Sequence, residues 1–403
     1  MRLLIVSPVY PFPPRDGSRI LVAEPLHYLT ELGHTVTLLC EGSPDVRHQP
    51  AVRGLHVHTV PASTRRDTRL RVLARSWFTG VPDAVLRACS PALQHAVAMH
   101  LHSGEYDLLH LEHQATAPLG RIARSLSIPA VLRQHNVEHD LYAGLAQLAL
   151  RSRNLSRWAH FELQARLVRR CATELSTHVD LCLALSQADA TTLSLLDPEL
   201  RIEILPAGAA TDQIVPAHSS EERAGLVVFP ANMGYAANSD AASWFCREVW
   251  PLVRRQHLTA QLALVGKNPP PGVRDLAALP GVTVTGEVPS MEPWLRAAQV
   301  VIAPLRIGAG VRIKLLEALA LGKAIVATPV AASGLELEDR RELRLAGDTP
   351  AFAGAVNDLL SDVDQRTHLS AQARARAEQS YSWPQIVQRQ SELYLSLLEH
   401  RQR

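Results

Sequence analysis

The sequence lacks a strong net charge, clustered cysteines and any long apolar run. Its 403 residues carry a formal net charge of +2. The chain therefore lacks the strong overall positive charge that would indicate a nucleic-acid partner. The five cysteines stand apart with no CxxC spacing, which indicates neither a zinc site nor a disulfide framework and fits a reducing, cytoplasmic setting. No run reaches the roughly 18 apolar residues that a transmembrane helix needs. The first apolar run ends at Pro8 rather than at a small-residue cleavage site, so we expect no signal peptide.

What the sequence does contain is an alternation of strands and helices along both halves. It predicts strands over residues 3–7, 35–40, 55–60, 107–111, 130–132, 181–186, 202–206, 226–230, 261–265, 282–285, 300–304 and 324–328, and helices over 20–32, 64–80, 151–175, 187–194, 241–256, 351–360 and 364–380. This pattern is typical of an α/β fold with one Rossmann-like domain in each half. Residues 207–225 are small, polar and aperiodic, so we expect the hinge there, between domains over 1–206 and 226–380. A final helix is expected within 381–403.

The most informative stretch covers residues 301–337. An apolar run leads into a loop with Gly308 and Gly310, and a helix follows in which Leu315, Leu316 and Leu319 recur at helical spacing. The loop should therefore lie at the carboxyl end of a strand, with a helix amino terminus pointing into it. Unpaired N–H groups and the helix dipole favour anions at such a place, and glycines let the backbone approach a phosphate closely.

Three charged residues stand in or beside this loop. Arg312 and Lys314 add positive charge at the start of the helix, and Glu317 follows about one turn later. An ionised carboxylate can accept two hydrogen bonds from a hydroxyl-rich group such as a ribose. The alternative is that Lys314 and Glu317, three residues apart, simply pair on a solvated helix face.

The run G-x-G-x-R-x-K-x-x-E-A-x-A-x-G-K resembles the donor-binding segment of the retaining GT-B glycosyltransferases of family 4, the group 1 glycosyltransferases. The resemblance covers nearly the whole chain and is strongest over residues 229–335. It implies two facing Rossmann-like domains with a nucleotide-sugar donor in the cleft, and a C-terminal helix that crosses back to the first domain. It further implies that Glu317 binds the donor ribose. The residues predicted to bind the donor are Gly17, Lys267, Gly308, Ala309, Gly310, Val311 and Glu317. For Lys267, a phosphate contact and an ordinary surface position are both open.

The sequence departs from the family pattern at several positions. The first Glu of the family's Glu-x7-Glu pair is Ala309 here, which leaves open how the sugar hydroxyls are held. Many members carry an Arg and a Lys in the loop after the strand at 226–230, where this chain has Asn232 and Asn238. Neutralisation of the donor phosphates would then depend on Arg312, Lys314 and helix amino termini.

In the first half, the densest polar cluster covers residues 133–139, directly after a predicted strand. Strand ends of this kind face the ligand crevice in open α/β sheets. The resemblance implies that His135 contacts the donor sugar near the reacting carbon; a capping or loop role is the alternative. The spacing H-N-V-E-H is not the H-E-x-x-H of a helical zinc site, and we expect no metal. Two roles are equally possible for Gly17, a contact with the donor and an ordinary turn position. For Asp16 the two roles are a contact with the acceptor and a helix cap.

Residues 64–80 combine five arginines with Leu70, Leu73, Trp77 and Phe78. A basic amphipathic helix of this kind can lie on an anionic membrane surface. It can equally be a solvated helix whose Trp and Phe face the core. A peripheral contact with the inner face of a membrane is therefore left open.

These observations predict a retaining glycosyltransferase that moves a sugar from a nucleotide-sugar donor to an acceptor hydroxyl, in bacterial glycan or glycoconjugate synthesis. The resemblance implies a front-face mechanism in which the departing phosphate accepts the acceptor's proton, with Arg312, Lys314 and His135 as catalytic residues and no cofactor beyond the donor substrate. The acceptor is open and includes a lipid-linked one. The alternatives are a sugar-nucleotide epimerase of the same architecture and a non-catalytic nucleotide-sugar-binding or scaffold protein.

Overall fold

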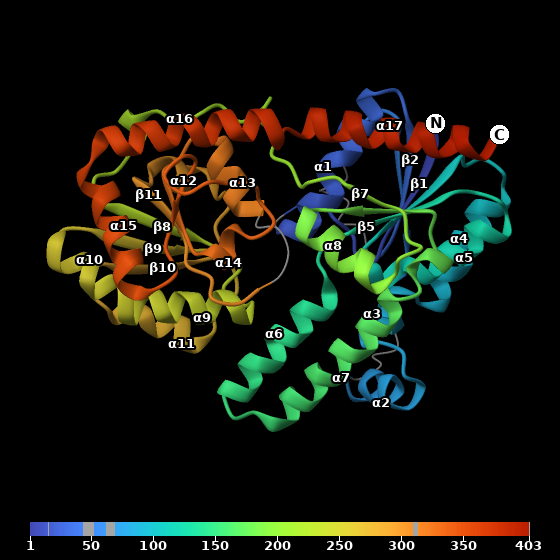
Figure 1. Ribbon diagram of the computed structural model, residues 1–403, viewed down its shortest axis with the longest axis horizontal. Helices are drawn as coiled ribbons and strands as arrows, with labels where there is room; N and C mark the ends of the chain where they lie inside the picture. The colour runs from blue at the N-terminus through green and yellow to red at the C-terminus, as the bar shows by residue number, and fades with distance from the viewer. Residues whose placement is uncertain (15, 43–51, 62–68, 309–312, 403) are drawn as a thin grey trace. The chain divides into compact units, whose positions relative to one another are not determined.

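The computed structural model describes residues 1–14, 16–42, 52–61, 69–308 and 313–402 (Figure 1). The chain divides into two compact units. Unit 1 comprises Met1–Ala207 together with Trp383–Arg403, and unit 2 comprises Gly208–Ser382. The final segment of the chain therefore belongs to the same unit as the first.

Unit 1 is built on a parallel sheet that has seven strands in the described part of the chain, in the order β3-β2-β1-β4-β5-β6-β7. Because β1 lies between β2 and β4, the order of the strands reverses between β1 and β4. In an open α/β sheet such a reversal is where ligands bind, at the carboxyl ends of the strands. The strands are β1 (Arg2–Ser7), β2 (Thr35–Glu41), β3 (Leu55–Val60), β4 (Leu108–Glu112), β5 (Ala130–Gln134), β6 (Leu181–Ala184) and β7 (Ile202–Ile204).

Helices surround this sheet. They are α1 (Gly17–Glu31), α2 (Arg69–Thr79), α3 (Asp83–Ala88), α4 (Pro91–His102), α5 (Gly120–Ser125), α6 (Glu138–Arg151), α7 (Leu155–Ala172), α8 (Gln187–Leu196) and α17 (Trp383–Gln402). Several begin at polar caps that the sequence places just before them. The side chain of Asp16 accepts a hydrogen bond from the Arg19 N–H at 3.1 Å, and Ser186 caps α8 by accepting one from the Asp189 N–H at 3.1 Å.

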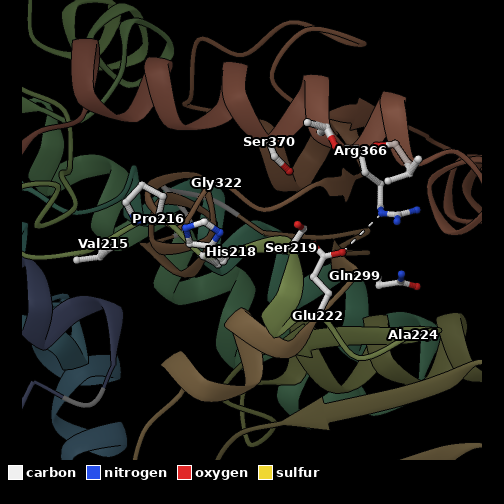
Figure 2. A pocket seen from close by; sticks show the side chains of 13 residues that line it. Val215, Pro216, His218, Ser219, Glu222, Ala224, Gln299, Gly322, Arg366 and Ser370 are labelled. Atoms are coloured by element: carbon white, nitrogen blue, oxygen red, sulfur yellow. Dashed lines mark hydrogen bonds and ion pairs between the residues drawn. The ribbon is translucent and has the colours of Figure 1, made fainter.

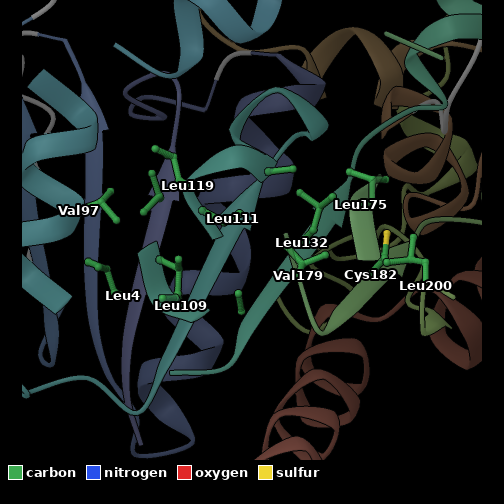
Figure 3. Packing of buried hydrophobic residues seen from close by; sticks show 14 of the residues in the cluster. Leu4, Val97, Leu109, Leu111, Leu119, Leu132, Leu175, Val179, Cys182 and Leu200 are labelled. Atoms are coloured by element: carbon green, nitrogen blue, oxygen red, sulfur yellow. The ribbon is translucent and has the colours of Figure 1, made fainter. Parts of the chain in front are cut away.

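One face of the sheet in unit 1 carries a continuous apolar core (Figure 3). Side chains alternate between the two faces of a strand, so Leu109 and Leu111 of β4 share this face. They pack with residues from β1, β5, β6 and the covering helices. The buried members labelled in Figure 3 are Leu4, Val97, Leu109, Leu111, Leu119, Leu132, Leu175, Val179, Cys182 and Leu200.

The opposite face is covered by α1 and α17 and is more polar. Arg133 on β5 is fully buried there and donates to the main-chain oxygen of Leu21 in α1 at 3.1 Å and to the Gln390 side chain in α17. Tyr394 of α17 is hydrogen-bonded to His110 of β4 at 2.7 Å. The last helix is thus anchored in unit 1 by buried polar contacts as well as by apolar packing.

Unit 2 repeats the architecture with a parallel sheet in the order β10-β9-β8-β11-β12-β13. Here the strand order reverses between β8 and β11. The strands are β8 (Leu226–Pro230), β9 (Gln261–Val265), β10 (Val282–Gly286), β11 (Val300–Ala303), β12 (Ile325–Ala327) and β13 (Arg344–Leu345). The helices are α9 (Ala236–Trp244), α10 (Trp250–Gln256), α11 (Pro271–Arg274), α12 (Glu292–Ala297), α13 (Ile313–Ala320), α14 (Pro329–Ala332), α15 (Thr349–Ser361) and α16 (Val363–Ser380).

The predicted α/β class with a parallel sheet in each half is confirmed, and three helix predictions need correction. The helix predicted over 151–175 is α7, which covers only Leu155–Ala172, and the helix before it, α6 (Glu138–Arg151), was not predicted; the chain turns between the two at Arg153, whose φ is 56°. The side chain of Asn154 then caps α7 through the Arg157 N–H at 3.1 Å. The helix predicted from residue 241 begins at Ala236 as α9 and passes through a π-helical turn at Phe245–Val249 into α10.

The third correction concerns residues 64–80. Residues 62–68 lie outside the described part of the chain, and within the described part α2 covers Arg69–Thr79. Trp77 and Phe78 do not face the core, since they are 57% and 90% exposed. Across the described residues, we find no helix with both the length and the apolar character to cross a membrane.

Candidate functional site

In unit 2, the candidate site lies at the carboxyl ends of β8, β9 and β11, where the strand order reverses. Helix α13 follows the loop after β11 and carries Lys314 and Glu317 in its first turns. Lys314 Nζ donates to both carboxylate oxygens of Glu317, at 2.7 and 2.8 Å. The two side chains are 26% and 23% exposed, so a ligand can reach both.

The structure describes the glycine loop before α13 as far as Gly308. Gly308 has a φ of 150°, a value that side-chain-bearing residues rarely adopt, so glycine is required where the chain leaves β11. The predicted donor contacts at Ala309, Gly310 and Val311, and the predicted catalytic Arg312, lie outside the described residues.

The loops after β8 and β9 are joined to each other. The Met233 N–H donates to the Lys267 main-chain oxygen at 2.9 Å, and Gly266 approaches Ala231 so closely that a Cβ on it would lie 1.8 Å from the Ala231 oxygen. The half-buried Lys267 thus stands on a tightly held turn at the site edge. Asn232 accepts from the Asn238 side chain through its main-chain oxygen at 2.8 Å, so these two residues shape the loop.

Sequence reasoning missed one cation at this edge. Arg306, three residues after β11, forms a two-bonded ion pair with Asp240 of α9, at 3.0 and 2.7 Å. Its guanidinium also lies 5.6 Å from the ring centre of Trp244. Asp240 and Arg306 are 66 residues apart, and only the adjacency of β8 and β11 brings them together.

In unit 1, the candidate site lies at the carboxyl ends of β1, β4 and β5. The predicted catalytic His135 directly follows β5 and is buried. Its Nε2 lies 2.6 Å from one oxygen of Glu112, at the end of β4, and His110 Nε2 lies 3.0 Å from the other oxygen. The parallel register pairs Glu112 with Arg133, two residues before His135, which is why these groups meet.

The charge on Glu112 is held by its surroundings. Burial would raise the pKa of this carboxyl, but the Arg133 charge and the hydrogen bonds from His110 and His135 hold the pKa well below its usual range. Glu112 is therefore ionised and accepts the Nε2 proton of His135. A carboxylate at one ring nitrogen fixes the tautomer and the orientation of an imidazole.

A second histidine stacks on the first. The rings of His113 and His135 have centroids 3.7 Å apart, and His113 Nε2 lies 3.0 Å from the hydroxyl of Ser18, which follows Gly17 in α1. Burial, with His135 close by, holds the pKa of His113 well below its usual range, so the imidazole is neutral. Gly17 therefore lies at the same edge as His135, one residue from a side chain that contacts the histidine pair. The φ of 71° at His113 is a strained value for a residue with a side chain.

Two family models match this sequence. The model described as "Glycosyl transferase 4-like domain" matches residues 17–208, and the model described as "Glycosyl transferases group 1" matches residues 224–362. Together they account for most of the chain and correspond to its two halves. The chain belongs to the group 1 glycosyltransferases. A search of curated proteins gave no match to this glycosyltransferase.

Solved structures share the GT-B fold of this glycosyltransferase over the full chain. Sucrose-phosphate synthase from Thermosynechococcus elongatus aligns with a TM-score of 0.73 at 16% identity, covering 99% of each chain. Anabaena HepE in complex with UDP-glucose aligns with a TM-score of 0.68 at 14% identity, covering 98% of this chain and 100% of that one. An α,α-trehalose-phosphate synthase (UDP-forming) from Burkholderia vietnamiensis aligns with a TM-score of 0.62 at 14% identity, covering 99% and 100%. At these identities the likeness establishes the fold.

The glycosyltransferase also has a cavity of about 620 Å³ in unit 2 that is separate from the candidate site (Figure 2). Ala224, two residues before β8, and Gln299, directly before β11, line the cavity, so it lies at the amino edge of the sheet. Glu222 in its wall accepts a hydrogen bond from the buried Lys323 at 2.8 Å and lies 3.7 Å from Arg366 of α16. These charges link the segment before β8 to α16, which is a structural role.

Proposed function

We propose that this glycosyltransferase moves a sugar from a nucleotide-sugar donor to an acceptor hydroxyl with retention at the anomeric carbon. Family membership supports the transfer of a sugar. The observation that carries the donor assignment is the Lys314–Glu317 pair on the first turns of α13, at the carboxyl edge of the unit 2 sheet. An ammonium for a phosphate and a carboxylate for a ribose, side by side and accessible, match the two polar parts of a nucleoside diphosphate.

The donor base is proposed to be uracil. Anabaena HepE binds UDP and UDP-glucose in its complexes, and the Burkholderia enzyme is described as UDP-forming. Their fold is the fold of this chain, which makes a UDP-sugar the first donor to test.

Catalysis is proposed to rest on stabilising the departing diphosphate. As the bond from the anomeric carbon to the phosphate oxygen breaks, its electron pair passes to that oxygen. The acceptor oxygen attacks from the same face, and its proton goes to the departing phosphate. Lys314, Arg312 and the amino terminus of α13 would stabilise the negative charge that develops.

His135 is proposed to act in unit 1 as a donor-sugar contact whose orientation Glu112 sets. The hydrogen-bonded imidazole is held in one orientation, which suits a group that must meet a substrate hydroxyl without moving. The acceptor is proposed to belong to bacterial glycan or glycoconjugate synthesis. The protein is proposed to work in the cytoplasm, with neither a metal ion nor a cofactor beyond the donor.

A second candidate function is nucleotide-sugar binding without transfer. It is favoured by Asn232 and Asn238, which bond within their own loop and supply no cation for the diphosphate. In that case the protein would bind the donor and leave it intact.

The test is a thermal-shift screen with UDP, GDP, TDP and their sugars, run on the parent and on Lys314→Ala. We expect one nucleotide to raise the melting temperature of the parent and to lose that effect in the variant. Arg255→Gln is the matched control, because this exposed arginine lies at the end of α10, away from the carboxyl edge.

Turnover of the stabilising nucleotide sugar then separates the two candidates. A transferase consumes the donor when its acceptor is present, and a binding protein does not. If no nucleotide shifts the parent, the donor site is wrongly assigned.

A further inference from the structure

Helix α2 presents an outward face that combines positive charge with large apolar side chains. Residues 71, 74, 75 and 78 share one face at helical spacing and are all exposed, whereas Ser76 on the opposite face is buried. Arg71 and Arg75 stand on the exposed face, with Phe78 90% and Trp77 57% exposed at its end. The apolar groups contribute nothing to the core, so their position needs another explanation.

The turn between α6 and α7 has the same chemistry. Residues 150–158 are all exposed, and they include Arg151, Arg153 and Arg157. Leu155 is 65% exposed, and Trp158 lies one turn further along α7. The turn itself, residues 152–154, is polar, and the exposed apolar side chains stand on the helix ends that flank it, Leu150 in α6 and Leu155 in α7.

The two segments lie on the same end of unit 1. Gln164 in the middle of α7 donates to the Ser76 hydroxyl of α2 at 2.9 Å and accepts from the Asp83 N–H at 2.9 Å. The hairpin tip lies ten residues before Gln164, or about 15 Å at the helical rise. Figure 1 shows α2, α6 and α7 together at one end of unit 1, away from α4 and α5. We name this surface, formed by the exposed residues of 71–78 and 150–158, the basic tip.

The basic tip carries charge of one sign only. No Asp or Glu occurs from residue 69 to 82 or from 141 to 161. The five arginines at 71, 75, 151, 153 and 157 form no ion pair with any residue that the structure describes. The unit is otherwise rich in such pairs, as Arg166–Glu162 further along α7 illustrates.

These features fit a lipid surface better than a macromolecule. A bilayer interface accepts Trp and Phe at headgroup depth and attracts arginines to anionic lipids. Nucleic acid could contact the arginines and stack on the aromatic rings, but it would leave the exposed leucines Leu150 and Leu155 in water. A protein partner would need a recess that receives a protruding hairpin. Both the charge and the protruding apolar groups are explained by a bilayer.

We propose that the basic tip docks unit 1 on the surface of a membrane that contains anionic lipids. The arginines contact the lipid phosphates, and Trp77, Phe78 and Leu155 enter the interface. The protein is then held peripherally, without a spanning segment. This surface and the donor site use different residues, so the docking is independent of the proposed catalytic function.

The test is co-sedimentation of the full chain with vesicles of phosphatidylcholine alone and of phosphatidylcholine mixed with phosphatidylglycerol. We expect binding to the mixed vesicles only, and weaker binding as salt is raised. Trp77→Ser with Phe78→Ser should reduce binding roughly tenfold or more, and so should Arg71→Gln with Arg75→Gln. Because these side chains are exposed, the variants should keep the parent melting temperature.

Matched controls use equally exposed residues elsewhere. Leu195→Ser with Leu258→Ser removes two exposed leucines, and Arg247→Gln with Arg255→Gln removes two exposed arginines; both pairs should bind vesicles as the parent does. The proposal is wrong if the parent ignores the mixed vesicles or if the Trp77→Ser, Phe78→Ser variant binds them like the parent. If heparin displaces the protein from the mixed vesicles and the Trp77→Ser, Phe78→Ser variant binds them as the parent does, the surface binds an acidic macromolecule instead.

Discussion

Lys314 and Glu317 neutralise each other on α13, so a donor has to replace their ion pair with contacts of its own. The phosphate would take the ammonium, and the ribose would take the carboxylate. This exchange suits a site that must release its product, because the pair reforms when the nucleotide leaves. Changes to the phosphate of the nucleotide should therefore affect its contact with Lys314, and changes to the ribose should affect its contact with Glu317.

Glu317→Gln tests the ribose contact. It removes a charged acceptor, so we expect UDP to bind about 10-fold more weakly, the size of a lost charge-assisted hydrogen bond. The loss should be smaller for 2′-deoxyuridine diphosphate if the carboxylate accepts from the 2′-hydroxyl. Titration calorimetry of both nucleotides on parent and variant measures the difference, and equal losses for the two would contradict a contact at that hydroxyl.

His113 predicts a pH dependence of stability. Its pKa in the folded protein lies well below the ordinary value of 6.5, because burial and nearby His135 disfavour the charged ring. Below pH 6.5 the unfolded chain therefore binds a proton that the folded chain does not. The free energy of unfolding is unaffected by this group above pH 6.5 and falls as the pH drops below it, by about 1.4 kcal/mol per unit.

His113→Asn should remove that dependence, because Asn tolerates the positive φ and carries no titrating group. Urea unfolding between pH 7.5 and about 5 should give a shallower slope for the variant than for the parent. The buried histidines that remain, such as His110, keep part of the slope. Identical slopes would show that His113 is not held neutral.

At the scale of single residues, the sequence could predict contacts within one element but few between elements. The three-residue spacing of Lys314 and Glu317 predicted their pairing as one alternative. The contact of His135 with Glu112 depends on the register of β4 against β5, and Arg306 with Asp240 depends on β8 lying beside β11. The sequence held a clue to the contact between His135 and Glu112, because polar residues follow both the strand predicted over 107–111 and the strand predicted over 130–132.

At the scale of elements, the turn after β9 shows how a single glycine holds the donor edge together. Gly266→Ala would place a Cβ 1.8 Å from the Ala231 oxygen, at a φ of 146°. We expect a loss of more than about 2 kcal/mol in the free energy of unfolding and weaker nucleotide binding, because the turn that carries Lys267 must shift.

Gly272→Ala is the control for that change. No atom lies within 4 Å of a Cβ at this position, and Gly272 is exposed within α11. The free energy of unfolding of the Gly272→Ala variant should exceed that of the parent by about 0.4 to 1 kcal/mol. Chemical unfolding of the two variants side by side makes the comparison, and equal stabilities would contradict the close approach at Gly266.

Helix boundaries were harder to predict than strands. The strands β3, β8 and β9 have the predicted bounds, because β8 and β9 are short apolar runs and β3 alternates apolar and polar residues. Helix α6 was missed, because its polar first turn, with Glu138 and Asp140, directly continues the polar cluster around His135 in the sequence. The turn at Arg153 contains no glycine or proline, and the start predicted for α7, at residue 151, lies four residues before its actual start at Leu155.

At the scale of the whole molecule, the last helix returns to the unit in which the chain began. Tyr394 in α17 is buried and bonded to His110, which bonds Glu112 in turn, so α17 supports the site around His135. Tyr394→Phe leaves a buried ring nitrogen without its partner, and we expect unit 1 to lose about 1 to 3 kcal/mol of stability. Gln388→Ala on the exposed face of α17 is the control and should have little effect.

Hydrogen exchange read by mass spectrometry locates that effect. Faster exchange in β4 and β5, with unit 2 unchanged, is the expected result for Tyr394→Phe. Faster exchange spread through unit 2 instead would contradict the assignment of α17 to unit 1.

The architecture as a whole followed from the sequence more readily than the site did. Alternating apolar runs and helices are enough to predict two parallel sheets, because parallel strands need helical connections. The order of strands within each sheet sets the place of strand reversal and therefore the site, and that order is fixed by packing between segments distant in the chain.

The most direct test of the central claim uses the scarcity of lysine. The chain has three lysines, Lys267, Lys314 and Lys323. Lys323 is buried against Glu222 and serves as an internal control that no reagent should reach. The measurement is acetylation of the folded protein, read lysine by lysine by mass spectrometry, with and without saturating UDP. Protection of Lys314 by UDP, with Lys323 unmodified in both samples, is the predicted result. Equal modification of Lys314 with and without UDP, GDP or TDP would contradict the donor site on α13.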